Sequence, residues 1–341
     1  MNPSSVTPSG LRWSCAFYTG LDTPDHIALA ERMGFYRAWV YDSPALCLDV
    51  WATLARAADR TTKIGLATGV IVPSLRHLSV TASAVAMMEM LAPGRFTLGV
   101  GTGFTGLRAL GHRPMRWRDV VDHVTALRAL LRGEAVPWES TVMRLLHPDG
   151  YLPAFPIEVP VYFATEGPKG LAAARGHADG VVTARHQPEG FDNAARIVFG
   201  TVLDDGEALD SDRVWEAAGP AAVLPYHGGY ETGRDISRLP NGAAWRAAVD
   251  ALPAAQRHLV LHRGHLIQVS ELDETHVPRA AVGALTFTGT VDQLRPRIAQ
   301  LAAAGITELI FQPAGPDIPR ELEAFTRLAA HGRADPASAT P

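Results

Sequence analysis

Glycine-containing stretches follow three predicted strands, at the positions where parallel α/β proteins bind their ligands. They are Thr68-Gly69-Val70, Gly101-Thr102-Gly103 and Glu166-Gly167-Pro168-Lys169. A glycine leaves the main chain uncovered, so a flat ligand can lie directly against the backbone there. The first two stretches therefore predict a shelf for a planar organic molecule. The alternative is that their glycines only relieve crowding where strands bend or pack closely.

The third stretch also opens a predicted helix at Pro168. Unpaired backbone amides at a helix start, together with the charge of Lys169, suit a phosphate group. However, Pro168 removes one of these donors, and Glu166 adds a negative charge that opposes a phosphate. In the alternative interpretation the Gly-Pro pair only starts the helix and Lys169 is solvated.

Two polar side chains, Asp42 and Ser43, directly follow another predicted strand. Barrel enzymes place catalytic groups at such strand ends. A carboxylate there can exchange a proton with a substrate, and a hydroxyl can contact a bound ring. The alternative for Asp42 is a structural role as a helix cap or in an ion pair.

Basic side chains crowd the loop that follows the strand predicted at 96–100, and only one acid, Asp119, accompanies them. The basic residues are Arg108, His112, Arg113, Arg116 and Arg118. Arginines can hold an acidic cofactor tail or an anionic substrate by charge-assisted hydrogen bonds. The alternative is that these arginines are solvated or paired with distant carboxylates.

Metal binding is not predicted. The HRGH sequence places His262 and His265 three residues apart, but no convincing third ligand follows. Cys15 and Cys47 are too few for a cysteine-based zinc site, and we expect both to be reduced thiols. The chain also lacks a G-x-S-x-G elbow, a Walker loop and a Rossmann fingerprint.

Strand and helix patterns alternate along the chain and would position these residues. A capping box at Thr290 and Gln293 starts the helix before the last strand. The helix after the third strand is predicted to bury Val80, Ala84, Met87, Met88 and Leu91. Eight strands with intervening helices predict a closed (β/α)8 TIM barrel. The strands are predicted at 12–18, 38–41, 63–72, 96–100, 159–164, 180–183, 197–203 and 306–311.

The domain organisation follows from where the alternation stops. We expect a flexible N-terminus at 1–10, a single barrel over 11–330 and a flexible tail at 331–341. The 204–286 stretch, after the seventh strand, does not continue the alternation. A loop of this length usually has structure and function of its own. It is therefore predicted to be a mainly helical insertion that lies over the barrel mouth as a lid.

Composition narrows the classes of partner. The chain has 341 residues, 47% of them apolar, and a net charge of -4 from 31 basic and 35 acidic residues. This near balance indicates neither nucleic acid nor an anionic membrane as a partner, and favours a small-molecule substrate. No apolar run reaches the roughly 20 residues that span a bilayer, and no signal peptide is recognisable. We therefore expect a cytoplasmic protein.

One long stretch carries a family resemblance. The sequence ATGVIVPSLRHLSVTASAVAMMEMLAPGRFTLGVGTG, together with YDSP and EGPKG, resembles the bacterial luciferase-like family. Within it, the chain is similar to the branch of deazaflavin (coenzyme F420)-dependent oxidoreductases that includes methylenetetrahydromethanopterin reductase. The resemblance implies that F420, or alternatively FMN, binds at the carboxyl-terminal mouth of a (β/α)8 barrel. It also implies a non-prolyl cis peptide at Gly69-Val70 behind the ring.

The same resemblance bears on catalysis. In the deazaflavin enzymes an acidic residue followed by histidine is common after strand two, and the histidine is often the proton donor or ring contact. Here Ser43 replaces that histidine, which leaves Asp42 or the Ser43 hydroxyl for the role. The predicted function is hydride transfer between reduced F420 and a small organic substrate, in a cytosolic enzyme expected to be a homodimer.

Three alternatives remain. The first is an FMN-dependent monooxygenase, which uses oxygen and needs a separate flavin reductase as a partner. The second is a phosphate-binding barrel lyase or isomerase with no redox cofactor, which would need a catalytic lysine or glutamate on an inner strand end. The third is a non-catalytic cofactor-binding or assembly subunit, a kind of protein that the family also contains.

Overall fold

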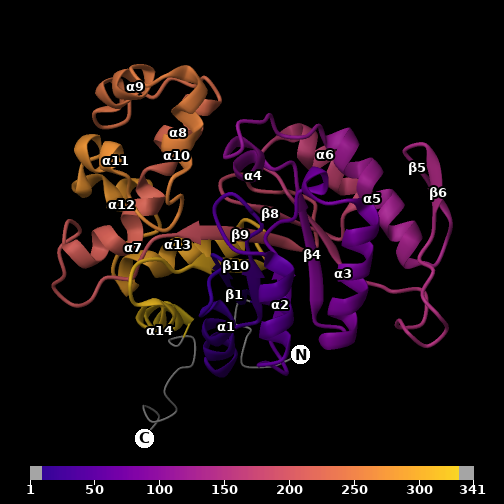
Figure 1. Ribbon diagram of the computed structural model, residues 1–341. Helices are drawn as coiled ribbons and strands as arrows, with labels where there is room; N and C mark the ends of the chain where they lie inside the picture. The colour runs from indigo at the N-terminus through magenta and orange to yellow at the C-terminus, as the bar shows by residue number, and fades with distance from the viewer. Residues whose placement is uncertain (1–9, 330–341) are drawn as a thin grey trace, which may run out of the picture.

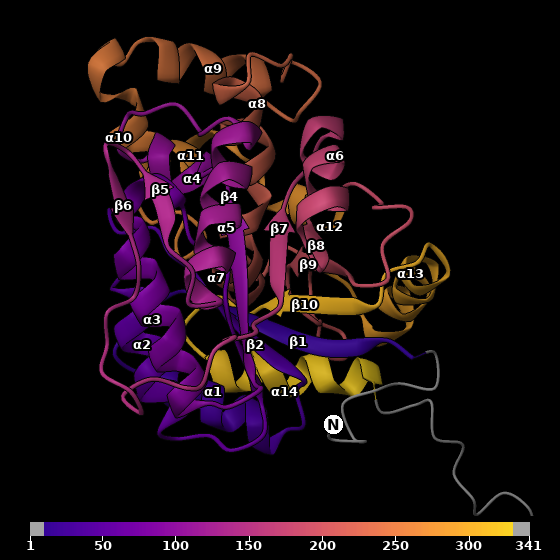
Figure 2. The same ribbon diagram turned by 90° about the vertical axis from the view of Figure 1, so that its right-hand side faces the viewer.

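Parallel strands close into a barrel in the computed structural model, which describes residues 10–329 (Figures 1 and 2). In chain order they are β1, β2, β3, β4, β7, β8, β9 and β10, and β10 pairs with β1 to close the ring. The predicted (β/α)8 barrel is confirmed. The barrel strands span Arg12–Phe17 (β1), Arg37–Val40 (β2), Gly65–Thr68 (β3), Phe96–Gly101 (β4), Val161–Ala164 (β7), Gly180–Thr183 (β8), Ala194–Phe199 (β9) and Glu308–Gln312 (β10).

Helices that alternate with the strands cover the outside of the barrel (Figure 1). They are α1 (Thr23–Arg32), α2 (Val50–Ala58), α3 (Leu78–Leu91), α5 (Trp117–Leu131), α6 (Pro168–His177), α13 (Val291–Ala303) and α14 (Ile318–Ala329). Asp49 caps α2, and the predicted capping box of Thr290 and Gln293 starts α13. The hairpin of β5 (Val136–Trp138) and β6 (Thr141–Met143) projects beside α5.

The inside of the barrel is closed at its base by a buried polar cluster and two aromatic rings. The Glu308 carboxylate pairs with Arg37 at 2.9 Å and accepts a hydrogen bond from the Trp39 indole at 2.9 Å. The Trp39 ring meets Tyr162 edge-on, with centroids 5.7 Å apart. A buried ion pair needs such additional hydrogen bonds, although the Arg37 Nε has no partner among residues 10–329.

Between β9 and α13 the chain forms a set of helices, here called the helical segment (residues 204–286), with its own core around Trp215, Tyr226 and Trp245. In both views α8, α9 and α10 lie on the same side of the barrel as α4 (Phe104–Arg108), which directly follows β4 (Figures 1 and 2). Its helices are α7 (Asp212–Ala222), α8 (Leu224–Glu231), α9 (Gly242–Asp250), α10 (Arg257–His262), α11 (Glu271–His276) and α12 (Val282–Leu285), with 3-10 turns at Ala254–Gln256 and Arg279–Ala281.

Two strands differ from the prediction by more than two residues at an end, whereas the others agree to within two. The strand expected at 197–203 begins at Ala194 and ends at Phe199, because Gly200 turns with φ +152° against the backbone of Phe287. The strand expected at 63–72 is regular only over β3. Beyond it the chain bends at Gly69, as expected, and resumes pairing through the single bridge of Ile71 to Val100.

The predicted buried face of α3 was partly wrong. Val80 and Met87 are 53% and 50% exposed, whereas Val85 and Met88 are buried, as is Leu78. Apolar residues occur on every side of this helix, so their spacing alone does not identify the buried face. The flexible ends expected at 1–10 and 331–341 lie outside the described residues, except for Gly10. Of the helices in residues 10–329, none is long and apolar enough to cross a membrane.

Candidate functional site

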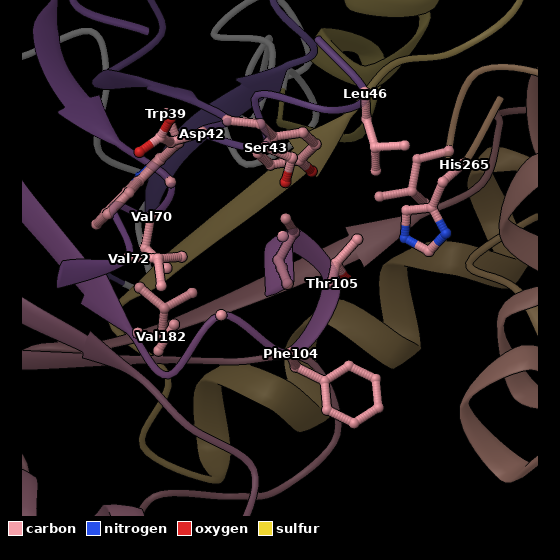
Figure 3. Close-up of a pocket in the computed structure, with 18 of the residues that line it drawn as sticks. Trp39, Asp42, Ser43, Leu46, Val70, Val72, Phe104, Thr105, Val182 and His265 are labelled. Carbon is pink, nitrogen blue, oxygen red and sulfur yellow. The ribbon is translucent and has the colours of Figure 1, made fainter. Parts of the chain in front are cut away.

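A cavity of about 260 Å³ opens at the carboxyl ends of the barrel strands, above the Trp39 ring (Figure 3). Every barrel strand contributes to its lining at or near its carboxyl end. Most of the lining is apolar, with a few polar groups such as Asp42, Ser43 and His265 among it. A largely apolar cavity with few convergent polar groups is the usual form of a cofactor or substrate site.

The shelf predicted from the glycines lies at this cavity. Gly69, Val70, Gly101, Thr102 and Gly103 all line it. The peptide between the first two residues is cis, as the family resemblance implies. The shelf thus comes from the ends of β3 and β4, which the barrel brings side by side.

The glycines of β4 serve close packing as well. A Cβ atom on Gly101 would lie 2.7 Å from the Val70 side chain, and one on Gly99 would lie 2.1 Å from the Thr68 carbonyl oxygen. Both distances are shorter than side chains tolerate, so β3 and β4 need glycine here. Thr68 itself does not line the cavity; its hydroxyl binds the backbone N–H and C=O of Gly99, each at 2.9 Å.

The predicted phosphate residues, Glu166 to Lys169, lie outside the lining of this cavity. The Glu166 carboxylate accepts hydrogen bonds from the backbone amides of Ala184, Arg185 and His186. Gly167 is the N-cap residue of α6, and Pro168 and Lys169 are exposed. The structure therefore separates this stretch from the other two, and phosphate binding by it stays a prediction.

Asp42 is buried at the cavity, with 3% of its surface exposed. Its Oδ2 forms a short ion pair with Arg76, which also contacts Asp49 at 3.0 Å. Within the described part of the chain, its Oδ1 is buried without a hydrogen-bond partner. Burial raises the pKa of Asp42 above the ordinary value, and the Arg76 charge opposes this rise. The ion-pair role considered for Asp42 is therefore present, together with a place at the cavity.

His265 lines the cavity and was missed as a site residue (Figure 3). Figure 3 shows it across the cavity from Asp42 and Trp39. Among residues 10–329 its Nδ1 has no hydrogen-bond partner. Burial, followed by the nearby His227 and His262, lowers the pKa of His265 to about 3, so its ring is neutral at physiological pH.

Two histidine–carboxylate pairs lie next to the His265 ring. His262, whose ring centroid is 5.6 Å from that of His265, contacts Glu231 at 2.8 Å. His227, with its ring centroid 6.5 Å from that of His265, contacts Asp273 at 3.0 Å. In residues 10–329 no group of three or more His, Cys, Asp or Glu side chains is arranged to hold a metal. The HRGH sequence was the available signal, but the sequence does not show which residues of the expected lid reach the cavity.

The loop that carries His265 is tied to the barrel. The Leu266 carbonyl accepts a hydrogen bond from the Gln312 side chain at 3.1 Å, and Gln312 accepts one from the Tyr41 hydroxyl at 2.8 Å. This chain of contacts joins the helical segment to the ends of β10 and β2. By contrast, the predicted arginine cluster is largely solvated: Arg116 and Arg118 pair with Asp119 on the surface.

Comparison with known proteins adds a family and several relatives. The family model described as luciferase-like monooxygenase matches residues 21–198. The chain is 26% identical to the 5,10-methylenetetrahydromethanopterin reductase of Methanolobus tindarius, over 85% of this chain and 89% of that protein. It is 27% identical to the F420-dependent glucose-6-phosphate dehydrogenase of Microbacterium testaceum, over 86% and 87%.

Solved structures show the same fold. The coenzyme F420 dependent tetrahydromethanopterin reductase of Methanopyrus kandleri superimposes with a TM-score of 0.65 at 18% identity, over 95% of this chain and 98% of that one. An F420-dependent secondary alcohol dehydrogenase, solved with an F420-acetone adduct, gives a TM-score of 0.64 at 17% identity, over 94% and 99%. At these identities the likeness establishes the barrel fold alone.

Proposed function

The chain belongs to the luciferase-like monooxygenase family, and from this premise we propose that it is an oxidoreductase that transfers a hydride between coenzyme F420 and a small organic substrate. The observation that carries the proposal is the apolar cavity whose wall is formed by Gly69-Val70 and Gly101 to Gly103. Relatives named as F420-dependent enzymes support deazaflavin as the cofactor.

The residues at the cavity fit a planar ring system. Val70 and the stretch from Gly101 to Gly103 would form one wall, and Trp39 would close the bottom. When bound, the reduced deazaflavin supplies the hydride. The protein's part is to orient the ring edge, to exclude water and to exchange a proton with the substrate.

A hydrogen bond to the substrate is proposed for His265. The Asp42 carboxylate is held by Arg76, so moving its proton would disturb a buried ion pair. A neutral imidazole can donate a hydrogen bond to a substrate oxygen, and the lowered pKa keeps His265 neutral. Ser43, in the place of the family's histidine, remains as a ring contact.

The helical segment is proposed to act as a lid that shapes the substrate pocket. His265 and Leu266 are its two residues at the cavity, and the Gln312 contact fixes the loop that carries them. The segment is also the part of the chain with its own core, which lets its shape differ while the barrel stays the same. The substrate would therefore be selected mainly by this segment.

The test is an optical titration of purified protein with F420 and, separately, with FMN. Bound deazaflavin absorbs near roughly 420 nm and bound flavin near roughly 450 nm, since the two ring systems differ. We expect saturable binding of F420 at micromolar concentration. Binding of FMN alone would instead support the monooxygenase with a partner reductase, and binding of neither would remove the proposal.

A matched pair of variants locates the ring. Thr105 lines the cavity from α4, and Thr141 lies exposed on the β5–β6 hairpin. Thr105→Trp should fill the mouth and weaken F420 binding at least 10-fold, whereas Thr141→Trp should leave binding unchanged. Equal binding by both variants would place the ring elsewhere. Turnover of any substrate by the native protein would exclude a non-catalytic subunit.

A further inference from the structure

A second cavity, of about 430 Å³, lies between β9 and the helices α8, α12 and α13, and is here called the arginine cavity. Ile197 and Phe199 line both this cavity and the one described above, so the two cavities are neighbours at β9. Figures 1 and 2 both show α12 and α13 beside β9. A ligand long enough to pass the end of β9 could therefore occupy both.

Three guanidinium groups face the arginine cavity, from Arg185, Arg196 and Arg297. Among residues 10–329, no Asp or Glu lines this cavity, and no carboxylate lies within 4.0 Å of any of the three groups. Arg76 and Arg213, by contrast, each pair with two carboxylates. The arginine cavity thus holds positive charge that no directly paired carboxylate neutralises.

The two more enclosed arginines are held in place by neutral groups. Arg196 is 7% exposed and donates to the Thr183 hydroxyl at 3.3 Å and to the His186 carbonyl at 2.6 Å. Arg297 lies 4.5 Å from the centre of the Phe287 ring and donates to the Thr286 carbonyl at 3.1 Å. These contacts orient both guanidinium groups without cancelling their charges.

The burial of these arginine charges favours the binding of an anion in the cavity. Burial lowers the pKa of Arg196 and of Arg297, which means that their charged forms are less well solvated than in water. The nearest acid to Arg196 that affects its pKa is Glu166, whose carboxylate is engaged by three backbone amides. An anion in the cavity would supply the missing opposite charge, and arginine binds carboxylates and phosphates in a two-pronged geometry.

We propose that the arginine cavity binds a carboxylate or phosphate group of a ligand whose uncharged part reaches the first cavity past Ile197 and Phe199. The proposal extends the proposed function, because the ligand is either the substrate or the acidic tail of the cofactor. Arg196 and Arg297 are the main anion contacts, and exposed Arg185 adds charge at the entrance.

Inorganic phosphate and malonate are the probes for the anion site. Each is added to the purified full chain, and the midpoint of thermal unfolding is compared with that in sodium chloride of equal ionic strength. We expect a saturable rise in the midpoint with at least one probe. An anion that binds only the folded state raises the midpoint by mass action, whereas screening by salt acts equally in the chloride control.

The decisive variant is Arg297→Met, with Arg295→Met as its matched control on the same helix. Arg295 lies two residues away, does not line the cavity and is 3.7 Å from Asp292. Arg297→Met should weaken anion binding at least 10-fold, and Arg295→Met should not. Circular dichroism and the midpoint without anion check that each variant is folded. Equal protection of both variants, or no saturable protection of the native chain, would overturn the proposal.

A parallel F420 titration separates the two sources of the anion. If Arg297→Met loses anion binding but keeps native F420 affinity, the anionic group belongs to the substrate. If F420 affinity falls together with anion binding, the group belongs to the cofactor tail. If the native chain binds phosphate or malonate at this cavity but no F420, the anion site stands and the proposed function fails.

Discussion

Asp42 and His265 lie on opposite sides of one cavity, but the charged groups next to them differ. Asp42 keeps a positively charged partner, Arg76, whereas His265 lies beside two histidine rings that are each paired with a carboxylate. At the scale of single residues, this difference supports the proposal that Asp42 holds the site together and that His265 donates a hydrogen bond to the substrate.

His265→Gln should therefore lower turnover about 100-fold, the lower end of the effect of removing a hydrogen-bond donor from an active site. F420 affinity should stay within 2-fold of native, because the proposed ring contacts come from β3 and β4. Turnover and F420 titration measured on the same preparation check both parts. His276→Gln is the control, since the ring of this histidine lies in the same segment, does not line the cavity and bonds to the Leu272 carbonyl. Native turnover in His265→Gln would show that this histidine is not needed for the reaction, and Asp42 and Ser43 would remain as candidates.

Asp42 should leave a signature in the pH dependence of stability. Its folded pKa lies above the unfolded value, so the folded chain binds the proton more tightly in the window between the two. The stabilisation by Asp42 is thus present below that window and is lost as the pH rises through it. Asp42→Asn should flatten this part of the curve of unfolding free energy, measured with denaturant between pH 3 and 7. The exposed Asp59→Asn variant should keep the native curve.

At the scale of secondary-structure elements, the site depends on how closely β3 and β4 approach. The Thr68 hydroxyl bridges the N–H and C=O of Gly99, and Gly101 leaves room for Val70. The glycine pattern of this stretch marked the strand ends correctly, because such close approach requires glycine. The pattern does not show whether a given glycine lies against a ligand or against a neighbouring strand, because both close contacts require glycine.

Gly101→Ala should displace the Val70 side chain, because the added methyl group would lie 2.7 Å from it. We expect a weaker F420 affinity, by about 10-fold, with the barrel still folded. Gly176→Ala is the control: it lies in exposed helix with no atom within 4 Å, and should stabilise the chain by about 0.5–1 kcal/mol. F420 titration measures the change in affinity, and the midpoint of unfolding measures the change in stability. An unchanged F420 affinity in Gly101→Ala would remove Val70 from the ring contact.

At the scale of the whole molecule, the barrel was predictable and a helical lid over its mouth was expected, but which residues of the helical segment reach the cavity was not predictable. Alternating apolar runs identify the strands, because each barrel strand is buried on both faces. The loop that carries His265 is held by a side-chain contact from Gln312 to the Leu266 carbonyl, and Leu266 itself has a φ of +64°. This contact joins residues that are 46 positions apart, and it leaves no periodic signal in the sequence. The sequence therefore does not indicate that His265 lines the cavity.

The exposed apolar side of α3 supports the expected homodimer. Val80, Met87 and Met90 are each about half exposed on this helix. We expect a particle of twice the 36.5 kDa chain mass in sedimentation equilibrium, and Met87→Glu should shift it toward the monomer, because a buried unpaired charge is costly at an interface. Glu89→Asp on the same helix should have no effect. A native chain that sediments as a monomer would contradict this prediction.

The separate core of the helical segment has an evolutionary consequence. Because Trp215, Tyr226 and Trp245 pack among residues of the segment itself, mutations there can accumulate without disturbing the strands that face the ring. Descendants of one ancestral barrel can thus acquire new specificities by remodelling a single contiguous stretch of gene. Chimaeras that exchange only this stretch between relatives should inherit the chemistry of the barrel donor and the selectivity of the segment donor.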